Sequence, residues 1–119
     1  MDYPIVWSPE ALADVEAIAS YIARDSAVYA QAVVEKILET ARHVREFPFM
    51  GRIVPELGQE AIRERLVYSY RLIYRIRNDT LTVAAVIHGR RLRVPSESGL
   101  KPPGVTNRLI RAGGQKRDA

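Results

Sequence analysis

The chain has 119 residues, 47% of them hydrophobic and 27% charged, a composition typical of one small globular domain rather than a disordered or fibrous protein. It contains no cysteine, which excludes disulfides, thiolate metal sites and cysteine nucleophiles and fits a reducing compartment. No apolar run approaches the ~18–20 residues that cross a bilayer, and two histidines are too few for a histidine-rich metal site. We therefore expect a cytoplasmic protein without membrane contact, metal or cofactor.

The formal net charge of +4 is distributed unevenly along the chain. Residues 1–50 hold 4 basic and 8 acidic side chains, residues 51–94 hold 9 and 4, and residues 95–119 hold 5 and 2. Of the 18 basic residues, 15 are arginine, whose planar guanidinium suits phosphate and carboxylate partners. The basic part of the chain therefore either faces an anionic partner, such as nucleic acid or an acidic protein, or is a solvated surface.

Two amphipathic helices are predicted in the first half of the chain. Ser8, Pro9 and Glu10 form a helix start, and the apolar residues that follow recur at spacings of three and four through about residue 24. Asp25 or Ser26 is a suitable cap for a second helix, which should end before residue 48 because the residue before a proline disfavours helical backbone. Since the two helices are adjacent and each is apolar on one side, we expect an antiparallel hairpin.

Alternation of apolar and polar residues predicts the strands. Residues 3–7 read as a short strand, residues 49–58 as a loop, and three strands follow from about residue 61, the last two joined by a turn at Asn78-Asp79. This order predicts an α+β fold in which an N-terminal strand and a two-helix antiparallel hairpin precede a three-stranded antiparallel sheet. We expect the domain to span residues 1–94 and residues 95–119 to form a basic, flexible tail.

The third strand combines an apolar face with a basic face. Alternation places Arg71, Ile73, Arg75 and Arg77 on one side, opposite the residues that should pack on the helices. A single layer of helices would leave this arginine face open to a partner. Tyr68, Tyr70 and Tyr74 fit either base stacking or the core, and their spacing with Leu66 and Leu72 favours the core. Trp7 is expected at the edge of the core or at the rim of a partner-binding surface.

The last strand ends in His88-Gly89-Arg90-Arg91. An imidazole beside guanidinium groups is able to serve phosphoryl transfer on RNA, with the histidine as acid or base and the arginines stabilising charge in the transition state. A second base is not evident, and Glu56 lies in a loop whose position the pattern does not fix. A histidine that hydrogen-bonds to structure, with arginines that keep the sheet soluble, is the other interpretation.

Four segments together resemble the RelE/ParE superfamily of bacterial type II toxins. They are Trp-Ser-Pro-Glu-Ala at residues 7–11, Gly-Arg-Ile-Val-Pro-Glu-Leu at 51–57, Tyr-Arg-Leu-Ile-Tyr-Arg-Ile at 70–76 and Val-Ile-His-Gly-Arg-Arg at 86–91. The resemblance covers residues 3–92. It implies the small α+β toxin fold, in which a helical hairpin packs on an antiparallel sheet that the N-terminal strand joins.

Members of this superfamily differ in their target. RelE-like toxins cleave mRNA on the ribosome without a metal, whereas ParE-like toxins poison DNA gyrase. Arg71 and Arg91 match arginines of the nuclease branch, but its paired lysines are replaced here by Ile-Arg-Glu-Arg at residues 62–65, and no tyrosine follows Tyr74. Glu56, Arg71 and His88 resemble the site residues of a second nuclease branch. That branch has an aromatic residue after the histidine, where this chain has Gly89. The central-loop motif and His-Gly-Arg-Arg are typical of ParE, so the resemblance favours gyrase.

The resemblance therefore implies a growth-arresting toxin, of the kind found in plasmid stabilisation systems, that binds and poisons gyrase. Its implied contact residues are Arg52, Arg71, Arg75, Arg90 and Arg91. The alternative is a ribosome-dependent mRNA endoribonuclease with Arg71, His88 and Arg91 in its catalytic site. A third reading is a degenerate toxin that only binds its antitoxin and regulates transcription.

Both active branches imply a hetero-oligomer with a cognate antitoxin, a segment of which covers apolar grooves of the helical hairpin or an exposed sheet edge. The positions expected to bind it are Leu12, Val15, Ile22, Val34 and Leu38.

Overall fold

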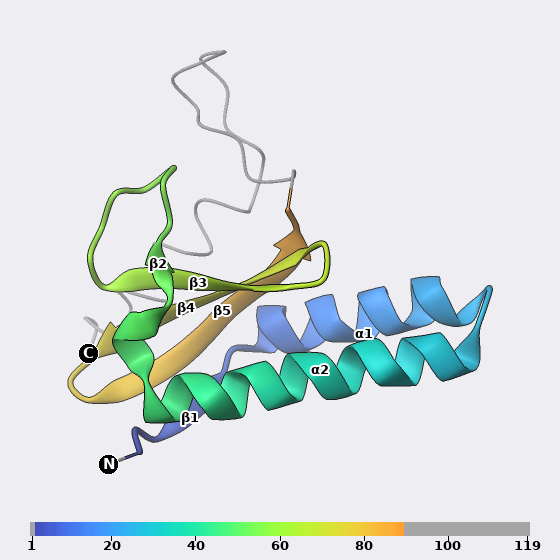
Figure 1. Ribbon diagram of the computed structural model, residues 1–119, viewed down its shortest axis with the longest axis horizontal. Coiled ribbons are helices and arrows are strands. Elements are labelled where there is room, and N and C mark those ends of the chain that lie inside the picture. Colours follow the sequence, from blue (N-terminus) through green and yellow to red (C-terminus); the bar gives the residue numbers. More distant parts are fainter. Residues whose placement is uncertain (1, 90–119) are drawn as a thin grey trace.

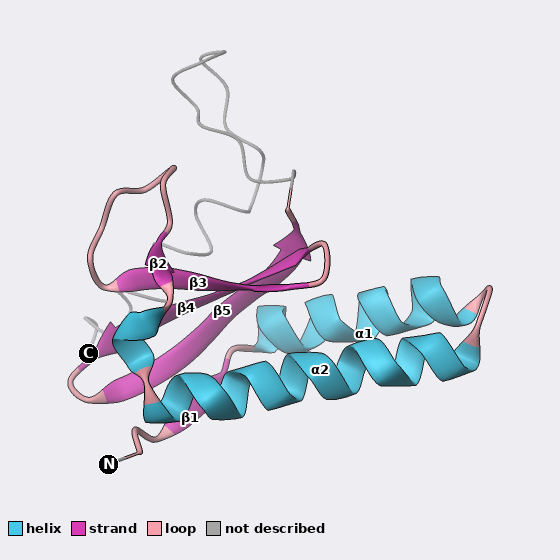
Figure 2. Cartoon of the chain, in the orientation of Figure 1, coloured by secondary structure: helices cyan, strands magenta, loops and turns pink. Residues whose placement is uncertain are grey.

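A computed structural model describes residues 2–89, in which two helices pack against one face of a five-stranded sheet (Figures 1 and 2). The elements in chain order are β1 (Ile5–Trp7), α1 (Pro9–Ala23), α2 (Ala27–Glu46), the 3-10 helix η1 (Pro48–Met50), β2 (Arg52–Ile53), β3 (Ile62–Val67), β4 (Tyr70–Arg77) and β5 (Thr80–His88). The predicted α+β order is confirmed. The expected domain boundary at residue 94, the tail at 95–119, Arg90 and Arg91 lie outside the described residues.

Both helices begin at the predicted caps. The Ser8 hydroxyl accepts a hydrogen bond from the Ala11 N–H at 3.0 Å, and the Ser26 hydroxyl accepts one from the Tyr29 N–H at 3.0 Å. Each serine therefore satisfies an N–H group that has no partner within the helix. The second helix ends at Glu46, before the proline that was expected to stop it. Together α1 and α2 form the helical hairpin, whose far ends project beyond the sheet (Figure 1).

The sheet has the strand order β1-β5-β4-β3-β2, with β1 parallel to β5 and the other neighbours antiparallel. Asn78 and Asp79 both have positive φ, 50° and 60°, so β4 and β5 are joined by the two-residue turn predicted there. Of the five strands, β2 was not predicted, because it has two residues and shows no alternation. It pairs with β3 through Arg52↔Glu64 and Ile53↔Arg63.

The main hydrophobic core lies between the helical hairpin and the sheet. Its buried members are Ala11, Val33, Ile37, Ala41, Val44, Val67, Leu72, Tyr74, Leu81, Val83 and Val86. Tyr70 packs against this core, as its spacing predicted, and Trp7 packs at the core edge, one of the two places expected for it. The buried Tyr74 hydroxyl donates to the Pro48 carbonyl at 2.6 Å. The expectation for Tyr68 was wrong: it lies exposed in the β3–β4 turn with φ 56°, where its side chain has left the alternation of the strands.

The opposite face of the sheet carries a second core, so the prediction of an open arginine face is wrong. Val54, Ile62, Ile73, Ala84, Ala85 and Ile87 are buried there, with Leu57 packed against them. The physical reason is the connection between β2 and β3, which supplies Val54 and Leu57 as a cover for the strands. The paired residues shift between Ile73↔Ala85 and Tyr74↔Val83, which makes Ala84 the extra residue of a β-bulge.

The first helix is fixed to the outer edge of β5 by polar groups. Beyond the end of β1, the Ser8 N–H donates to the Val83 carbonyl at 3.0 Å and the Ser8 hydroxyl donates to the Ala84 carbonyl at 3.3 Å. The Asp14 carboxylate accepts from the Val86 N–H at 2.9 Å. These contacts satisfy backbone groups that a three-residue β1 leaves unpaired. Within residues 2–89 no helix combines the length and apolar character needed to span a membrane.

Candidate functional site

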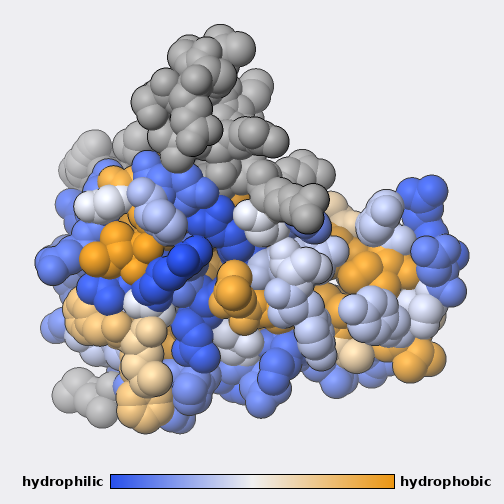
Figure 3. All heavy atoms as spheres, turned by 45° about the horizontal axis from the view of Figure 1, so that its top comes forward, coloured by the Kyte–Doolittle hydropathy of each residue, from blue (hydrophilic) through white to orange (hydrophobic). Residues whose placement is uncertain are grey.

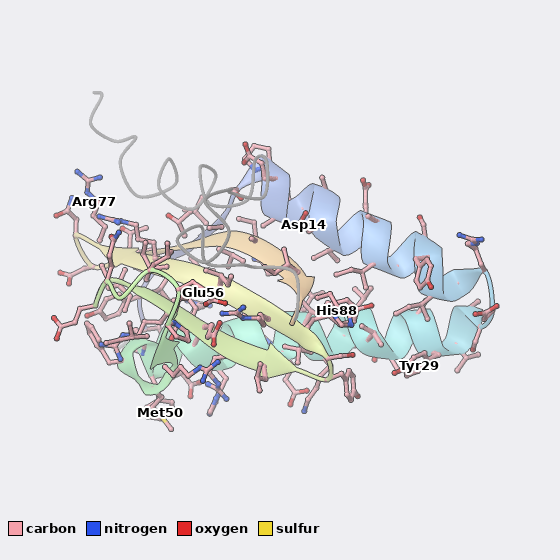
Figure 4. All side chains as sticks on the ribbon, turned by 90° about the horizontal axis from the view of Figure 1, so that it is seen from above. Asp14, Tyr29, Met50, Glu56, Arg77 and His88 are labelled. Atoms are coloured by element: carbon pink, nitrogen blue, oxygen red, sulfur yellow. The ribbon has the colours of Figure 1, made fainter. Side chains whose placement is uncertain are left out.

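The segment Gly-Arg-Ile-Val-Pro-Glu-Leu-Gly at residues 51–58 forms β2 and a tight turn over the second core. The Leu57 and Gly58 N–H groups both donate to the Val54 carbonyl, at 3.0 and 2.9 Å, and Gly58 has a φ of 63° that favours glycine. A Cβ at Gly51 would lie 2.8 Å from the Glu64 carbonyl oxygen, so only glycine allows β2 to approach β3 this closely. The turn directs Glu56 toward β4, over the sheet (Figure 4).

Two arginines and two glutamates form a connected network on this face. Arg71 makes a bidentate pair with Glu56, with Nη1 2.9 Å from Oε2 and Nη2 2.8 Å from Oε1. The Arg71 Nε donates to Glu64 Oε1 at 2.6 Å, and the Arg52 Nε donates to the other oxygen, Oε2, at 2.6 Å. We call Arg52, Glu56, Glu64 and Arg71 the carboxylate–arginine network. Its charges balance, so a set of ions that would be costly to bury singly is held as a neutral group.

Burial falls steeply across this network. The side chain of Glu64 is 1% exposed, Arg71 5%, Glu56 15% and Arg52 65%. Hydrogen bonding to Glu56 raises the pKa of Arg71, against the effect of burial and together with the Glu64 carboxylate. Burial alone would raise the pKa of Glu56, but the hydrogen bond and positive charge of Arg71, with the charge of Arg52, lower it overall. All three Arg71 nitrogens contact carboxylate oxygens, so its guanidinium is already committed.

The other predicted arginines of β4 lie farther along the same face. Arg75 is partly buried, and its Nε has no hydrogen-bond partner among the described residues. Burial, and then the charge of Arg77, lower the pKa of Arg75. Arg77 lies at the end of β4 (Figure 4). Of the predicted target-contact residues that the structure describes, Arg52 is therefore the one with a largely exposed side chain.

The structure does not bring His88 and Arg71 onto one face. His88 pairs with Tyr70 across the strands and their rings meet edge to face, with centroids 5.9 Å apart, whereas Arg71 pairs with Ile87. Because side chains alternate along a strand, His88 lies on the side of Tyr70 and Arg71 on the opposite side. Glu56, considered as a second base, is paired with Arg71. The three residues therefore do not form one acid–base site in this arrangement.

The apolar positions expected to bind an antitoxin divide by exposure. Leu12 and Leu38 are exposed, Val34 is half-buried, and Val15 and Ile22 pack against the main core. Figure 3 shows apolar residues gathering over the projecting end of the helical hairpin. The exposed large apolar residues at that end are Tyr21, Val28 and Tyr29.

Sequence reasoning missed two acidic residues with structural tasks: Glu64, which joins the two arginines of the network, and Asp14, which fixes α1 to the edge of β5. Glu64 lies two residues after the buried Ile62 on β3 and therefore faces the same side, so a carboxylate at an inward-facing position was the available signal. Asp14 gave no such signal, because an acid in the second turn of a helix is ordinarily solvated. Among residues 2–89, no three histidine, aspartate or glutamate side chains gather in a group able to hold a metal ion.

Comparisons with known proteins agree with this architecture. Residues 5–93 match the family model described as the ParE toxin of the type II toxin–antitoxin system parDE. The fold is similar to a chromosomal ParDE system from P. aeruginosa, at TM-score 0.61 and 17% identity over 72% of this chain and 95% of that one. It is also similar to a mutant of the E. coli toxin RelE in the free state, at TM-score 0.59 and 20% identity over 83% and 96%.

A third structure, the toxin–antitoxin complex RelBE2 from Mycobacterium tuberculosis, is similar at TM-score 0.51 and 22% identity over 74% of this chain and 99% of that one. At these identities the structural similarity establishes the fold, and the family model establishes the family. A search of curated proteins finds no match to the sequence. The chain, with its helical hairpin, its five-stranded sheet and its central-loop motif, belongs to the ParE family of type II toxin–antitoxin toxins.

Proposed function

We propose that this toxin arrests growth by binding and poisoning DNA gyrase and that a cognate antitoxin neutralises it. The observation that carries the proposal is the state of Arg71, the arginine that a nuclease of this superfamily would direct at RNA. Each of its side-chain nitrogens contacts a carboxylate. A phosphate would have to displace two carboxylates from a buried guanidinium.

The energetic argument concerns what that displacement would cost. Breaking a buried ion pair costs about 3–5 kcal/mol, because it leaves an unpaired charge away from water. RNA binding at Arg71 would also bring phosphate charge next to Glu56 and Glu64. Together with the separation of His88 from Arg71 on opposite faces, this disfavours the endoribonuclease alternative based on Arg71, His88 and Arg91. Binding a target without catalysis does not require Arg71 to leave Glu56 and Glu64.

The proposed gyrase-contact residues then have different tasks. Arg52 presents a mostly exposed guanidinium, which Glu64 holds through its Nε. Arg71 acts through Glu64 as a positioning residue for Arg52 rather than as a contact. Arg75, Arg90 and Arg91 complete the proposed basic surface. An arrangement of this kind suits an acidic protein surface, since a guanidinium pairs well with carboxylates.

The proposed antitoxin site is the helical hairpin. Leu12 and Leu38 are exposed there, and Val34 is half-buried. An amphipathic segment that packs on these positions would remove them from water, at about 25 cal/mol per Å² of apolar surface. Val15 and Ile22, which are partly buried against the main core, shape the hairpin beneath these positions.

The test is expression of the chain without an antitoxin, with three readouts: growth, DNA double-strand breaks and mapped mRNA cleavage. We expect growth arrest with DNA breaks and without mRNA cleavage. Arg90→Glu with Arg91→Glu should abolish the arrest, whereas the matched reversal Lys116→Glu with Arg117→Glu should not. Arrest accompanied by mRNA cleavage that His88→Ala removes would replace gyrase by the ribosome. Normal growth of cells that accumulate folded protein would identify a degenerate toxin.

A further inference from the structure

The end of α2 leads into three exposed apolar side chains. Phe47, Phe49 and Met50 are 46%, 56% and 64% exposed, while Pro48 between them is buried. The backbone that carries them is fixed, because the Phe47 N–H donates to the His43 carbonyl at 3.2 Å and the Met50 N–H donates to the Phe47 carbonyl at 3.1 Å. The Tyr74 hydroxyl also holds the Pro48 carbonyl at 2.6 Å. Since Pro48 occupies the only inward position of this turn, its neighbours are directed outward.

Two arginines of β3 lie beside these side chains. The Arg63 guanidinium stacks over the Phe49 ring, 5.1 Å from its centroid, and its Nη1 donates to the Phe49 and Gly51 carbonyls at 3.0 and 3.1 Å. Arg65 Nη1 lies 3.4 Å from His43 Nδ1. Within the described part of the chain neither arginine pairs with a carboxylate. We call Phe47, Phe49, Met50, Arg63 and Arg65 the aromatic–arginine patch.

The composition of this patch indicates the kind of partner. Aromatic residues, methionine and arginine are the types enriched in protein–protein interfaces, and exposed apolar groups beside unpaired cations complement an acidic segment with apolar anchors. A base-stacking surface needs free ring faces. Here Arg63 already covers Phe49, and the His43 ring lies 5.3 Å from that of Phe47. Met50 points away from the body of the molecule (Figure 4), which suits insertion into a partner's pocket.

We propose that the aromatic–arginine patch is the surface through which the toxin docks on an acidic, apolar-bearing segment of its protein target. The patch adjoins the start of β2, but Arg63 and Arg65 flank Glu64 on β3 and so face the side of the helices, whereas Arg52 bonds Glu64 on the other face of the sheet. The patch lies at the opposite end of α2 from the turn that joins the two helices, and so remains separate from the projecting end of the hairpin (Figure 1). The inference rests on the proposed function only for the identity of the target, not for the location of the docking surface.

The test uses single substitutions in the full chain, each with a matched control. Arg65→Glu is compared with Arg24→Glu, an equal charge reversal at the hairpin turn, and Met50→Glu with Ala32→Glu, an equal charge addition on an exposed helical position. We expect both patch variants to keep the parent's unfolding temperature and to need about tenfold or more protein for growth arrest and for inhibition of purified gyrase. Both controls should match the parent.

The outcomes separate this inference from the proposed function. Patch variants that still arrest growth at the parent's dose would overturn the inference, and so would a parent that arrests no growth, since it would have no target to dock on. Loss of arrest in the patch variants, with a parent that leaves gyrase unaffected, would retain the docking surface and reject gyrase. If the parent binds a labelled single-stranded RNA oligonucleotide and both patch variants lose that binding, the partner is nucleic acid and the protein assignment is wrong.

Discussion

Replacing Arg71 with methionine separates a structural from a functional role of this arginine. The substitution removes the guanidinium and leaves Glu64, 1% exposed, and Glu56, 15% exposed, as carboxylates without their shared partner. Protonating a carboxyl of ordinary pKa 4.5 at pH 7 costs about 3 kcal/mol, which agrees with about 3–5 kcal/mol for breaking a buried pair. With a urea m-value of about 1.5 kcal/mol/M, the unfolding midpoint should fall by about 2 M or more.

Three comparisons sharpen this prediction. Glu64→Gln should cost less than Arg71→Met, because Arg71 keeps its bidentate pair with Glu56 and the exposed Arg52 is hydrated. The penalty of Arg71→Met should shrink as the pH falls toward 4.5, since the Glu56 carboxyl, left without Arg71, then becomes neutral. Arg24→Met, on the surface, should change stability by about 0.5 kcal/mol or less. Full stability of Arg71→Met together with lost growth arrest would refute the structural role and return Arg71 to the functional site.

Three further predictions concern single residues: Glu56, Asp14 and Asp79. Because the folded-state pKa of Glu56 is below its ordinary 4.5, its contribution to stability is complete above that value and is lost as the pH falls through the folded-state pKa. Glu56→Gln should therefore flatten the acid side of the stability curve in urea titrations, and an unchanged curve would argue against the pair. Asp14→Ala should lower the free energy of unfolding by about 1–3 kcal/mol, measured by thermal unfolding, because it leaves the Val86 N–H without its acceptor. Asp14→Asn should lower it by less. Equal losses in the two variants would exclude this hydrogen bond as the cause. Asp79→Gly should raise the unfolding temperature and Asp79→Val should lower it, because φ is 60° there; the reverse order would contradict the turn.

Much of the fold was predictable because its signals are local. Ser8 and Ser26 cap the helices as expected, and the alternation along β4 identified the side that packs on the helices. The second core was not predictable in this way. Arg71 and its neighbours read as a polar face, and the sequence contains no local sign that the segment from Val54 to Leu57 folds back over it.

The candidate site was predictable only in part, for the same reason. The resemblance singled out Arg52, Glu56 and Arg71, but periodicity treats each charge as a solvated group. The missing information was that Glu64 lies inward on β3, between the two arginines. A long-range ion-pair network depends on strand register, and the pairing Arg52↔Glu64 comes from a strand too short to predict.

The most direct test of the gyrase proposal is an assay of purified DNA gyrase with the purified toxin, following both supercoiling and the accumulation of cleaved DNA. The account predicts inhibition or trapped cleavage complexes at near-stoichiometric toxin, with full activity restored by the cognate antitoxin. Unaffected supercoiling and no cleaved DNA, with a toxin shown to be folded by circular dichroism and able to arrest growth in cells, would contradict it.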